Sequence, residues 1–166
     1  MQQPAPADVA DRLRRLVAQA IPDPRGVDAW QSFLHAHATL LRQLTTDLVD
    51  EVGLTLGDFD VLAQLARAGG ELRMSDLAAQ AYSSRSGMTR RIDRLVGEGL
   101  VCRANTDADG RGVVVALTPG GVERLAEVAP VHLRRVSELF VEKLTDEELS
   151  TLASALHKVA LDCTFG

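Results

Sequence analysis

The sequence is poor in aromatic residues and in long apolar runs, and each shortage excludes a class of protein. Phenylalanine, tryptophan and tyrosine make up 4% of the 166 residues. This argues against a carbohydrate site or a single-strand nucleic-acid surface built on stacked rings. The longest apolar runs, such as 113–117, are far shorter than the roughly 20 residues that span a bilayer. No secretion signal stands at the N-terminus, so we expect a cytoplasmic protein without a membrane partner.

Cysteine and catalytic motifs are equally scarce. Cys102 and Cys163 lie far apart, outside any Cys-x-x-Cys or Cys/His ligand spacing, which predicts reduced thiols, no metal and no cofactor. There is no Ser-His-Asp arrangement, phosphate-binding loop or HExxH motif. Glu147 and Glu148 belong to a predicted helix cap, not to a catalytic carboxylate pair. The sequence does not indicate an enzyme.

Positive charge is also in short supply overall, yet it is concentrated in one segment. The formal net charge is −5, which counts against indiscriminate nucleic-acid binding. Residues 83–104 nevertheless hold five arginines against two acids, Asp93 and Glu98. A basic segment between acidic flanks predicts one directed contact face.

Apolar residues at spacings of three and four predict a series of helices. Gly53 and Gly99 are the expected helix stops, and Ser75 and Ser84 the expected N-caps. Two β-prone runs around the turn-rich 105–111 predict a hairpin. In chain order the predicted helices cover 8–20, 27–52, a short stretch within 54–70, 74–81, 84–96, 119 to about 143 with a kink at Pro130, and 146 to about 161.

Three short helices followed by a two-stranded wing are typical of a winged helix-turn-helix. The last of them, residues 84–96, has an expected buried line of Met88, Ile92, Leu95 and Val96. Gly87 would permit close approach to a partner, while Ser83 and Ser84 could donate hydrogen bonds to a phosphate. On the opposite side of this helix fall Arg85, Ser86, Thr89, Arg90 and Asp93.

The predicted hairpin carries an arginine near its tip. Arg111 could enter a minor groove, with Asp109 two residues earlier to orient it. Two plainer explanations stay open: a solvated basic helix face, and an ordinary Asp-Gly-Arg turn. We favour contact with DNA because serines, glycine and arginines share one side of a helix-turn-helix.

The segment MTRRIDRLVGEGLVCRANTDADGRGVVVALTPGG resembles the MarR family of bacterial transcriptional regulators, and the resemblance spans residues 27–162. By position, Thr89 and Arg90 match recognition-helix contacts, Arg103 the basic residue that begins the wing, and Asp109 and Arg111 the wing pair. The resemblance implies a homodimer that binds pseudo-palindromic double-stranded operators and usually represses.

The predicted fold class is therefore mainly α with a small β-hairpin, a winged helix-turn-helix lobe between long dimerisation helices. We expect an N-terminal extension (1–26), a dimerisation helix (27–53), the DNA-binding lobe (54–118) and C-terminal dimerisation helices (119–166). The predicted DNA-binding residues are Ser75, Ser83, Ser84, Arg85, Ser86, Gly87, Thr89, Arg90, Arg94, Arg103, Asp109 and Arg111.

Family members commonly respond to small aromatic effectors. The candidate effector residues are Trp30, His35, His37, Asp60 and Arg91. Asp60 and Arg91 match two ligand positions of the urate-responsive branch, but helix 8–20 has no tryptophan and Ala104 replaces an expected arginine. Control by cysteine oxidation or by a metal, and a protein-interaction module that has lost DNA binding, remain alternatives.

Overall fold

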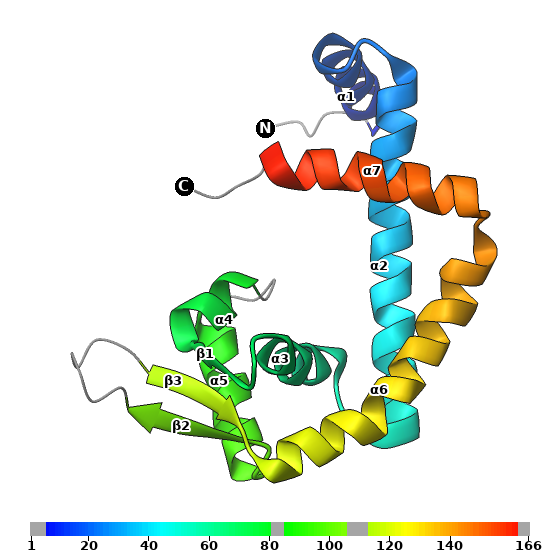
Figure 1. Cartoon of the computed structure of the whole chain (residues 1–166). Helices are drawn as coiled ribbons and strands as arrows, with labels where there is room; N and C mark the ends of the chain where they lie inside the picture. The colour runs from blue at the N-terminus through cyan, green and yellow to red at the C-terminus, as the bar shows by residue number, and fades with distance from the viewer. Residues whose placement is uncertain (1–5, 81–84, 106–112, 163–166) are drawn as a thin grey trace. The chain divides into compact units, whose positions relative to one another are not determined.

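The structure is a computed structural model of the chain and describes residues 6–80, 85–105 and 113–162 (Figure 1). It divides into two compact units, Met1–Arg42 and Gln43–Gly166, and each is described by itself. The predicted tip of the wing and the predicted cap Ser84 lie outside the described residues.

The first unit is helical. Helix α1 spans Pro6–Ala20, and α2 spans Pro24–Val52, so that α2 continues into the second unit. Helix α2 begins three residues before the predicted start, because Pro24 suits the first helical turn and Asp23 accepts a hydrogen bond from the Arg25 backbone N–H at 3.0 Å. The ion pair between Asp23 and Arg25, with 2.7 Å between Oδ2 and Nη2, lowers the pKa of that carboxyl group.

The second unit has the predicted fold class, a mainly helical winged helix-turn-helix with a small sheet. Its elements are α3 (Leu56–Arg67), β1 (Glu71–Arg73), α4 (Met74–Gln80), α5 (Arg85–Gly97), β2 (Val101–Asn105), β3 (Val113–Leu117), α6 (Pro119–Leu139), a 3-10 helix (Val141–Lys143) and α7 (Asp146–Asp162).

The sheet has one strand more than the predicted hairpin. All pairs are antiparallel in the order β1-β3-β2, with Leu72 opposite Val115 and Arg103 also opposite Val115. Strand β1 was not predicted, because three residues with two charges carry almost no alternation pattern. Its pairing with β3 places the start of α4 directly after the sheet (Figure 1).

Strand β1 also explains an error in a predicted helix cap. Ser75 was expected to precede α4, but the helix begins at Met74, immediately after β1 ends at Arg73. Ser75 therefore lies inside the first turn, where its hydroxyl donates to Asp76 at 3.2 Å. The predicted end of α5 is confirmed: Gly99 has a φ of 72°, and the Leu100 N–H donates to the Leu95 carbonyl at 2.9 Å.

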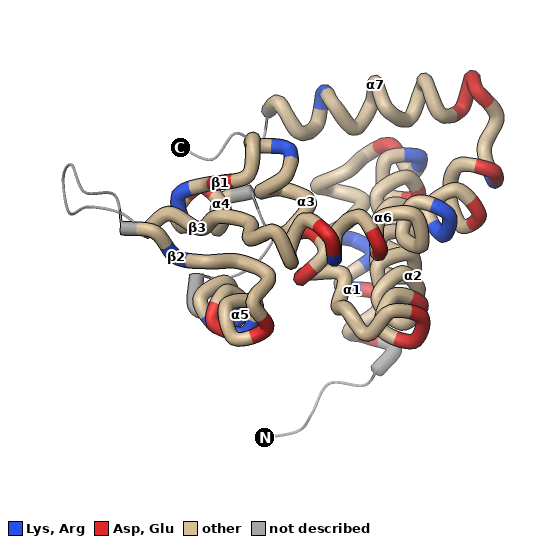
Figure 2. Tube along the Cα trace, turned by 60° about the horizontal axis from the view of Figure 1, so that its bottom comes forward, with Lys and Arg blue, Asp and Glu red and all other residues tan. Residues whose placement is uncertain are grey.

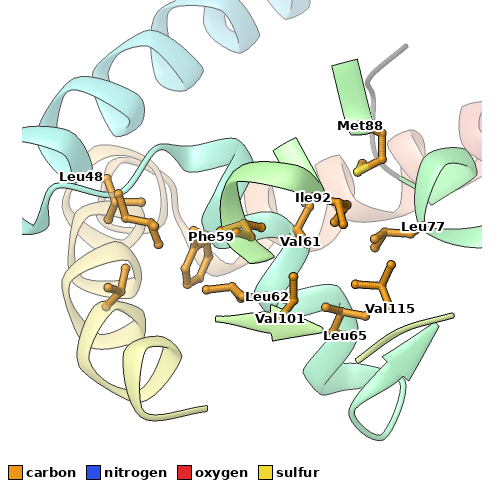
Figure 3. Close-up of a cluster of buried hydrophobic side chains, with 13 residues drawn as sticks. Leu48, Phe59, Val61, Leu62, Leu65, Leu77, Met88, Ile92, Val101 and Val115 are labelled. Carbon is orange, nitrogen blue, oxygen red and sulfur yellow. The ribbon is translucent and has the colours of Figure 1, made fainter. Parts of the chain in front are cut away.

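One apolar core joins the elements of the second unit (Figure 3). The predicted inward residues Met88, Ile92 and Leu95 of α5 are fully buried, as are Leu62 and Leu65 of α3. Val96 was predicted to be buried and is instead 37% exposed. The three buried positions of α5 already complete the stripe that faces α3 and the sheet, and Val96 falls beside it.

The start of helix α6 is bonded to the turn between α5 and β2. Thr118 Oγ1 accepts a hydrogen bond from the Gly121 N–H at 3.0 Å and donates to the Gly99 carbonyl at 2.6 Å. The helix ends at Leu139, and a 3-10 turn covers the rest of the stretch predicted as helix up to Lys143. The predicted capping box of α7 is confirmed, since Thr145 and Glu148 exchange backbone-to-side-chain bonds. The bonds that the Glu148 carboxylate accepts from the Thr145 N–H and hydroxyl lower the pKa of Glu148.

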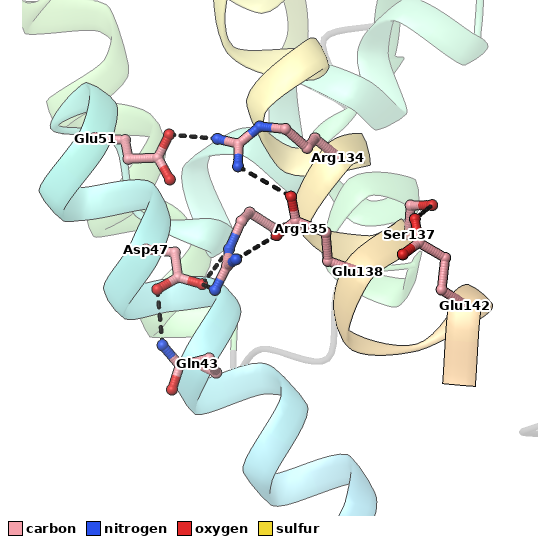
Figure 4. A network of polar contacts seen from close by, with 8 residues as sticks. All are labelled: Gln43, Asp47, Glu51, Arg134, Arg135, Ser137, Glu138 and Glu142. Carbon is pink, nitrogen blue, oxygen red and sulfur yellow. Dashed lines mark hydrogen bonds and ion pairs between the residues drawn. The ribbon is translucent and has the colours of Figure 1, made fainter. Parts of the chain in front are cut away.

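A polar cluster fastens α6 to the C-terminal part of α2 (Figure 4). Arg135 pairs with Asp47 at 2.5 Å, and Arg134 pairs with Glu51 at 2.6 Å. Glu138 contacts both arginines from their own helix. We call this set the α2–α6 joint. Hydrogen bonds from Gln43 and Arg135 lower the pKa of Asp47.

Within the described residues, every helix is too short or too polar to cross a membrane.

Candidate nucleic-acid interface

Helix α5 presents two distinct faces. Met88, Ile92 and Leu95 point into the core, while Thr89, Arg90 and Asp93 are exposed. Gly87 is half-buried at the start of the helix. A helix that enters a major groove needs one apolar face packed against its own lobe and an opposite, exposed polar face.

The structure locates most of the other predicted DNA-binding residues. Ser75 is exposed in the first turn of α4. Arg85 and Ser86 begin α5, and their side chains fall outside the described part of the structure. Arg94 is on α5 and Arg103 on β2, each in an ion pair. Ser83, Ser84, Asp109 and Arg111 lie outside the described residues.

The residue that the sequence analysis missed is Asp58, whose side chain is 4% exposed. It stands in the first turn of α3, and the hydroxyl of the N-cap Thr55 donates to its Oδ2 at 2.5 Å. Its Oδ1 accepts from Arg94 Nη2 of α5 and lies 3.4 Å from Arg91 Nε. One buried carboxylate therefore holds two arginines of α5.

The contact between Arg91 and α3 is close-packed. A Cβ atom placed on Gly57 would lie 2.5 Å from Arg91 Nη2 and 2.7 Å from Cζ. Gly57 therefore leaves the space that the guanidinium occupies over the start of α3. A larger residue there would displace Arg91 from Asp58.

Arg103 connects the wing to α5. Its Nη2 lies 2.6 Å from Asp93 Oδ1, which joins β2 to the exposed side of α5. Arg94 also has Glu98 within 3.9 Å. Figure 2 shows basic and acidic residues intermixed at α5, not a uniformly basic helix. Much of the predicted basic segment is thus neutralised within the lobe.

Arg90 differs from its neighbours. It is exposed on α5, and within the described residues it forms no ion pair or hydrogen bond. Of the α5 arginines whose side chains are described, Arg90 is the one whose guanidinium remains available to an outside partner.

The candidate effector residues are divided between the two units. In the first unit, Phe33 stacks between Trp30 and His37, with 6.0 Å between neighbouring ring centroids. His35 is exposed. In the second unit, Asp60 Oδ2 accepts from Gln64 Nε2 at 2.6 Å, and Arg91 is held by Asp58. The predicted effector role of these residues stays a prediction.

A histidine that the sequence analysis did not select lies between α3 and α6. The His132 ring is 4.4 Å from the Phe59 ring, centroid to centroid. Its Nδ1 is buried, with no hydrogen-bond partner in the described structure. Burial lowers the pKa of His132, while the nearby Asp60 charge opposes that shift. Because its apolar neighbour Phe59 is distant in sequence, periodicity alone could not reveal this environment.

Comparison with known proteins identifies the family. The family model for the MarR family matches residues 52–112. The chain is 30% identical over 120 residues to the multiple antibiotic resistance protein MarR of Salmonella typhimurium, covering 70% of this chain and 81% of that protein. The chain belongs to the MarR family of transcriptional regulators, as the sequence motifs indicated.

Two solved structures agree with this assignment. AbsC, a MarR family transcriptional regulator from Streptomyces coelicolor, has 36% identity and a TM-score of 0.75, with 81% of this chain and 90% of AbsC covered. Sco3205 from the same organism, solved in complex with DNA, has 28% identity and a TM-score of 0.80, with 87% and 91% covered.

Proposed function

We propose that this chain is a homodimeric repressor that inserts α5 of each subunit into successive major grooves of a pseudo-palindromic operator. The observation that carries the proposal is the exposed line of α5, which presents Thr89 and Arg90 opposite a fully buried apolar line. Arginine is the side chain best suited to read guanine in the major groove. The DNA complex of Sco3205, a relative of similar fold, supports the same use of the lobe.

The roles of the other predicted residues follow from their positions. Arg85 and Ser86 begin α5, where recognition helices reach bases, and Ser75 on α4 would contact a phosphate. Arg103 would orient the wing through Asp93. Arg111, with Asp109, would contact the minor groove or the backbone. Release by a small effector at Trp30, His35, His37, Asp60 or Arg91 remains part of the proposal.

The first test is fluorescence anisotropy of the purified protein on a duplex from its own upstream intergenic region, against a scrambled duplex, over a salt series. We expect tight, sequence-dependent binding with a steep salt slope. Equal, weak binding to both duplexes would contradict the proposal for that operator, and a selection of bound genomic fragments would then decide whether any sequence is preferred.

Arg90→Ala tests the residue that carries the proposal. Each lost base contact costs about 1–3 kcal/mol, and the homodimer loses one in each subunit, so operator affinity should fall by at least about thirtyfold. Arg67→Ala is the matched control, because Arg67 is an exposed arginine of α3 in the same lobe. Unchanged operator binding by Arg90→Ala would remove Arg90 from the interface.

A further inference from the structure

We infer that Asp58 is a specificity-determining residue: it withholds Arg91 and Arg94 from the phosphate backbone, so that Arg90 and its polar neighbours on α5 govern recognition. The inference rests on the proposed function. It assigns Asp58 a positioning role, since it acts through the two arginines and does not itself touch DNA.

The geometry of the carboxylate supports this role. Asp58 is 4% exposed, and both of its oxygens are occupied: Oδ2 by the Thr55 hydroxyl, and Oδ1 by Arg94 and Arg91. A carboxylate with so little exposure cannot easily exchange its partners for water, because an uncompensated buried charge is strongly unfavourable. The two ion pairs are therefore less screened by solvent than a pair between two fully exposed side chains.

The charge of α5 explains why holding these arginines matters. Non-specific DNA affinity depends on the number of phosphates that lysine and arginine side chains neutralise. Arg91 is 27% exposed and Arg94 49% exposed, so both lie near the surface and would reach solvent if released. Without Asp58, the described arginine side chains that α5 offers to DNA would rise from one to three, and binding to non-specific sequences would increase.

Asp58→Asn tests this directly, because the amide keeps the shape of the side chain and an oxygen for Thr55 but loses the charge. Glu98→Gln is the matched control: it removes one negative charge beside the same Arg94, where the carboxylate is half-exposed and 3.9 Å away. Each variant and the wild type are titrated with operator and scrambled duplexes across a salt series, and their thermal unfolding is recorded.

We expect Asp58→Asn to bind the scrambled duplex about three- to tenfold more tightly than Glu98→Gln does. Its operator preference should fall by about three- to tenfold, and its salt slope should steepen by roughly 1–2. Adding Arg94→Gln to Asp58→Asn should reverse most of the gain. A purely structural role would instead lower the unfolding temperature and weaken binding to both duplexes in the same proportion, which would overturn the inference.

A second measurement covers the case in which Asp58→Asn does not fold. Arg94→Gln and Arg90→Gln are compared in the otherwise unchanged chain on the scrambled duplex. We expect a loss of less than twofold for Arg94→Gln and a clearly larger loss for Arg90→Gln; equal losses would overturn the inference. If the wild type binds the operator no more tightly than the scrambled duplex, the proposed function is wrong. If the wild type prefers the operator and Asp58→Asn has the same ratio of operator to scrambled-duplex affinity, only the inference about Asp58 is wrong.

Discussion

Two neighbouring glycines in the first turn of α6 differ in how closely they approach the segment that precedes β2. Gly121 is in the first turn of α6 and is buried. A Cβ atom added there would lie 2.0 Å from the Leu100 carbonyl oxygen, whereas one added at the neighbouring Gly120 would meet its nearest atom, the Gly99 carbonyl oxygen, at 3.5 Å. The backbone of α6 therefore approaches the start of β2 closely at one glycine and not at the next.

This difference predicts opposite outcomes for two alanine substitutions. Gly121→Ala must displace backbone, and overpacking of this kind costs about 1–3 kcal/mol of the free energy of unfolding. Gly120→Ala has room, and the gain in helix propensity leaves it neutral or stabilising by up to about 1 kcal/mol. Urea unfolding of both variants measures the difference, and equal effects would contradict the close contact.

For single residues, the sequence predicted which side chains are buried better than it predicted which residues they contact. It correctly placed Met88, Ile92 and Leu95 in the core, because helical spacing reports which residues share a face. It missed Asp58, whose partners Arg91 and Arg94 are 33 and 36 positions further along the chain. No local pattern distinguishes a buried acid of this kind from a solvated one.

Between elements, the packing of α3 against α6 contains a histidine whose pKa is lowered by burial. His132 of α6 lies against Phe59 of α3, and burial lowers its pKa below the ordinary value of about 6.5. The folded protein therefore holds the neutral ring, whereas the unfolded chain accepts the proton more readily.

The sign of the pH dependence follows from this shift. Stability is fully present above the unfolded pKa and is lost as the pH falls below about 6.5, until the folded pKa is also passed. We expect the unfolding midpoint in urea to fall between pH 7.5 and 5.5, and to fall less in His132→Leu. An identical slope in the two proteins would mean that His132 does not contribute.

Elements were predicted well where a pattern extends over several turns and poorly where it is short. The helix ends at Gly53 and Gly99 and the capping box of α7 were correct, because each depends on neighbouring residues. Strand β1 was missed and Ser75 was wrongly assigned as the N-cap of α4, because three residues become a strand through pairing with β3. Tertiary contacts, not local propensity, define such elements.

For the whole molecule, the exposed apolar residues indicate a partner surface. In the second unit, Leu133 of α6 and Val159 of α7 are 63% and 62% exposed. Exposed apolar side chains on the terminal helices agree with the proposed homodimer, which would bury them against a second copy.

Val159→Asp tests this surface. A carboxylate placed at a buried subunit contact is unfavourable unless it is paired, so the dimer should dissociate at concentrations where the wild type remains assembled. Operator affinity should fall with it, since one lobe reads only half a pseudo-palindromic site. Sedimentation velocity measures the assembly; a Val159→Asp protein that sediments like the wild type would place the dimer contact elsewhere.

The ion pair between Arg103 of β2 and Asp93 of α5 also constrains how this sequence can diverge. Reversing or removing one charge alone leaves its partner without a counterion at the junction of wing and helix. Substitution at position 93 should therefore be tolerated mainly together with a matching change at position 103. Among descendants of this gene, the two sites are expected to change as a correlated pair, although nine other residues separate them in the sequence.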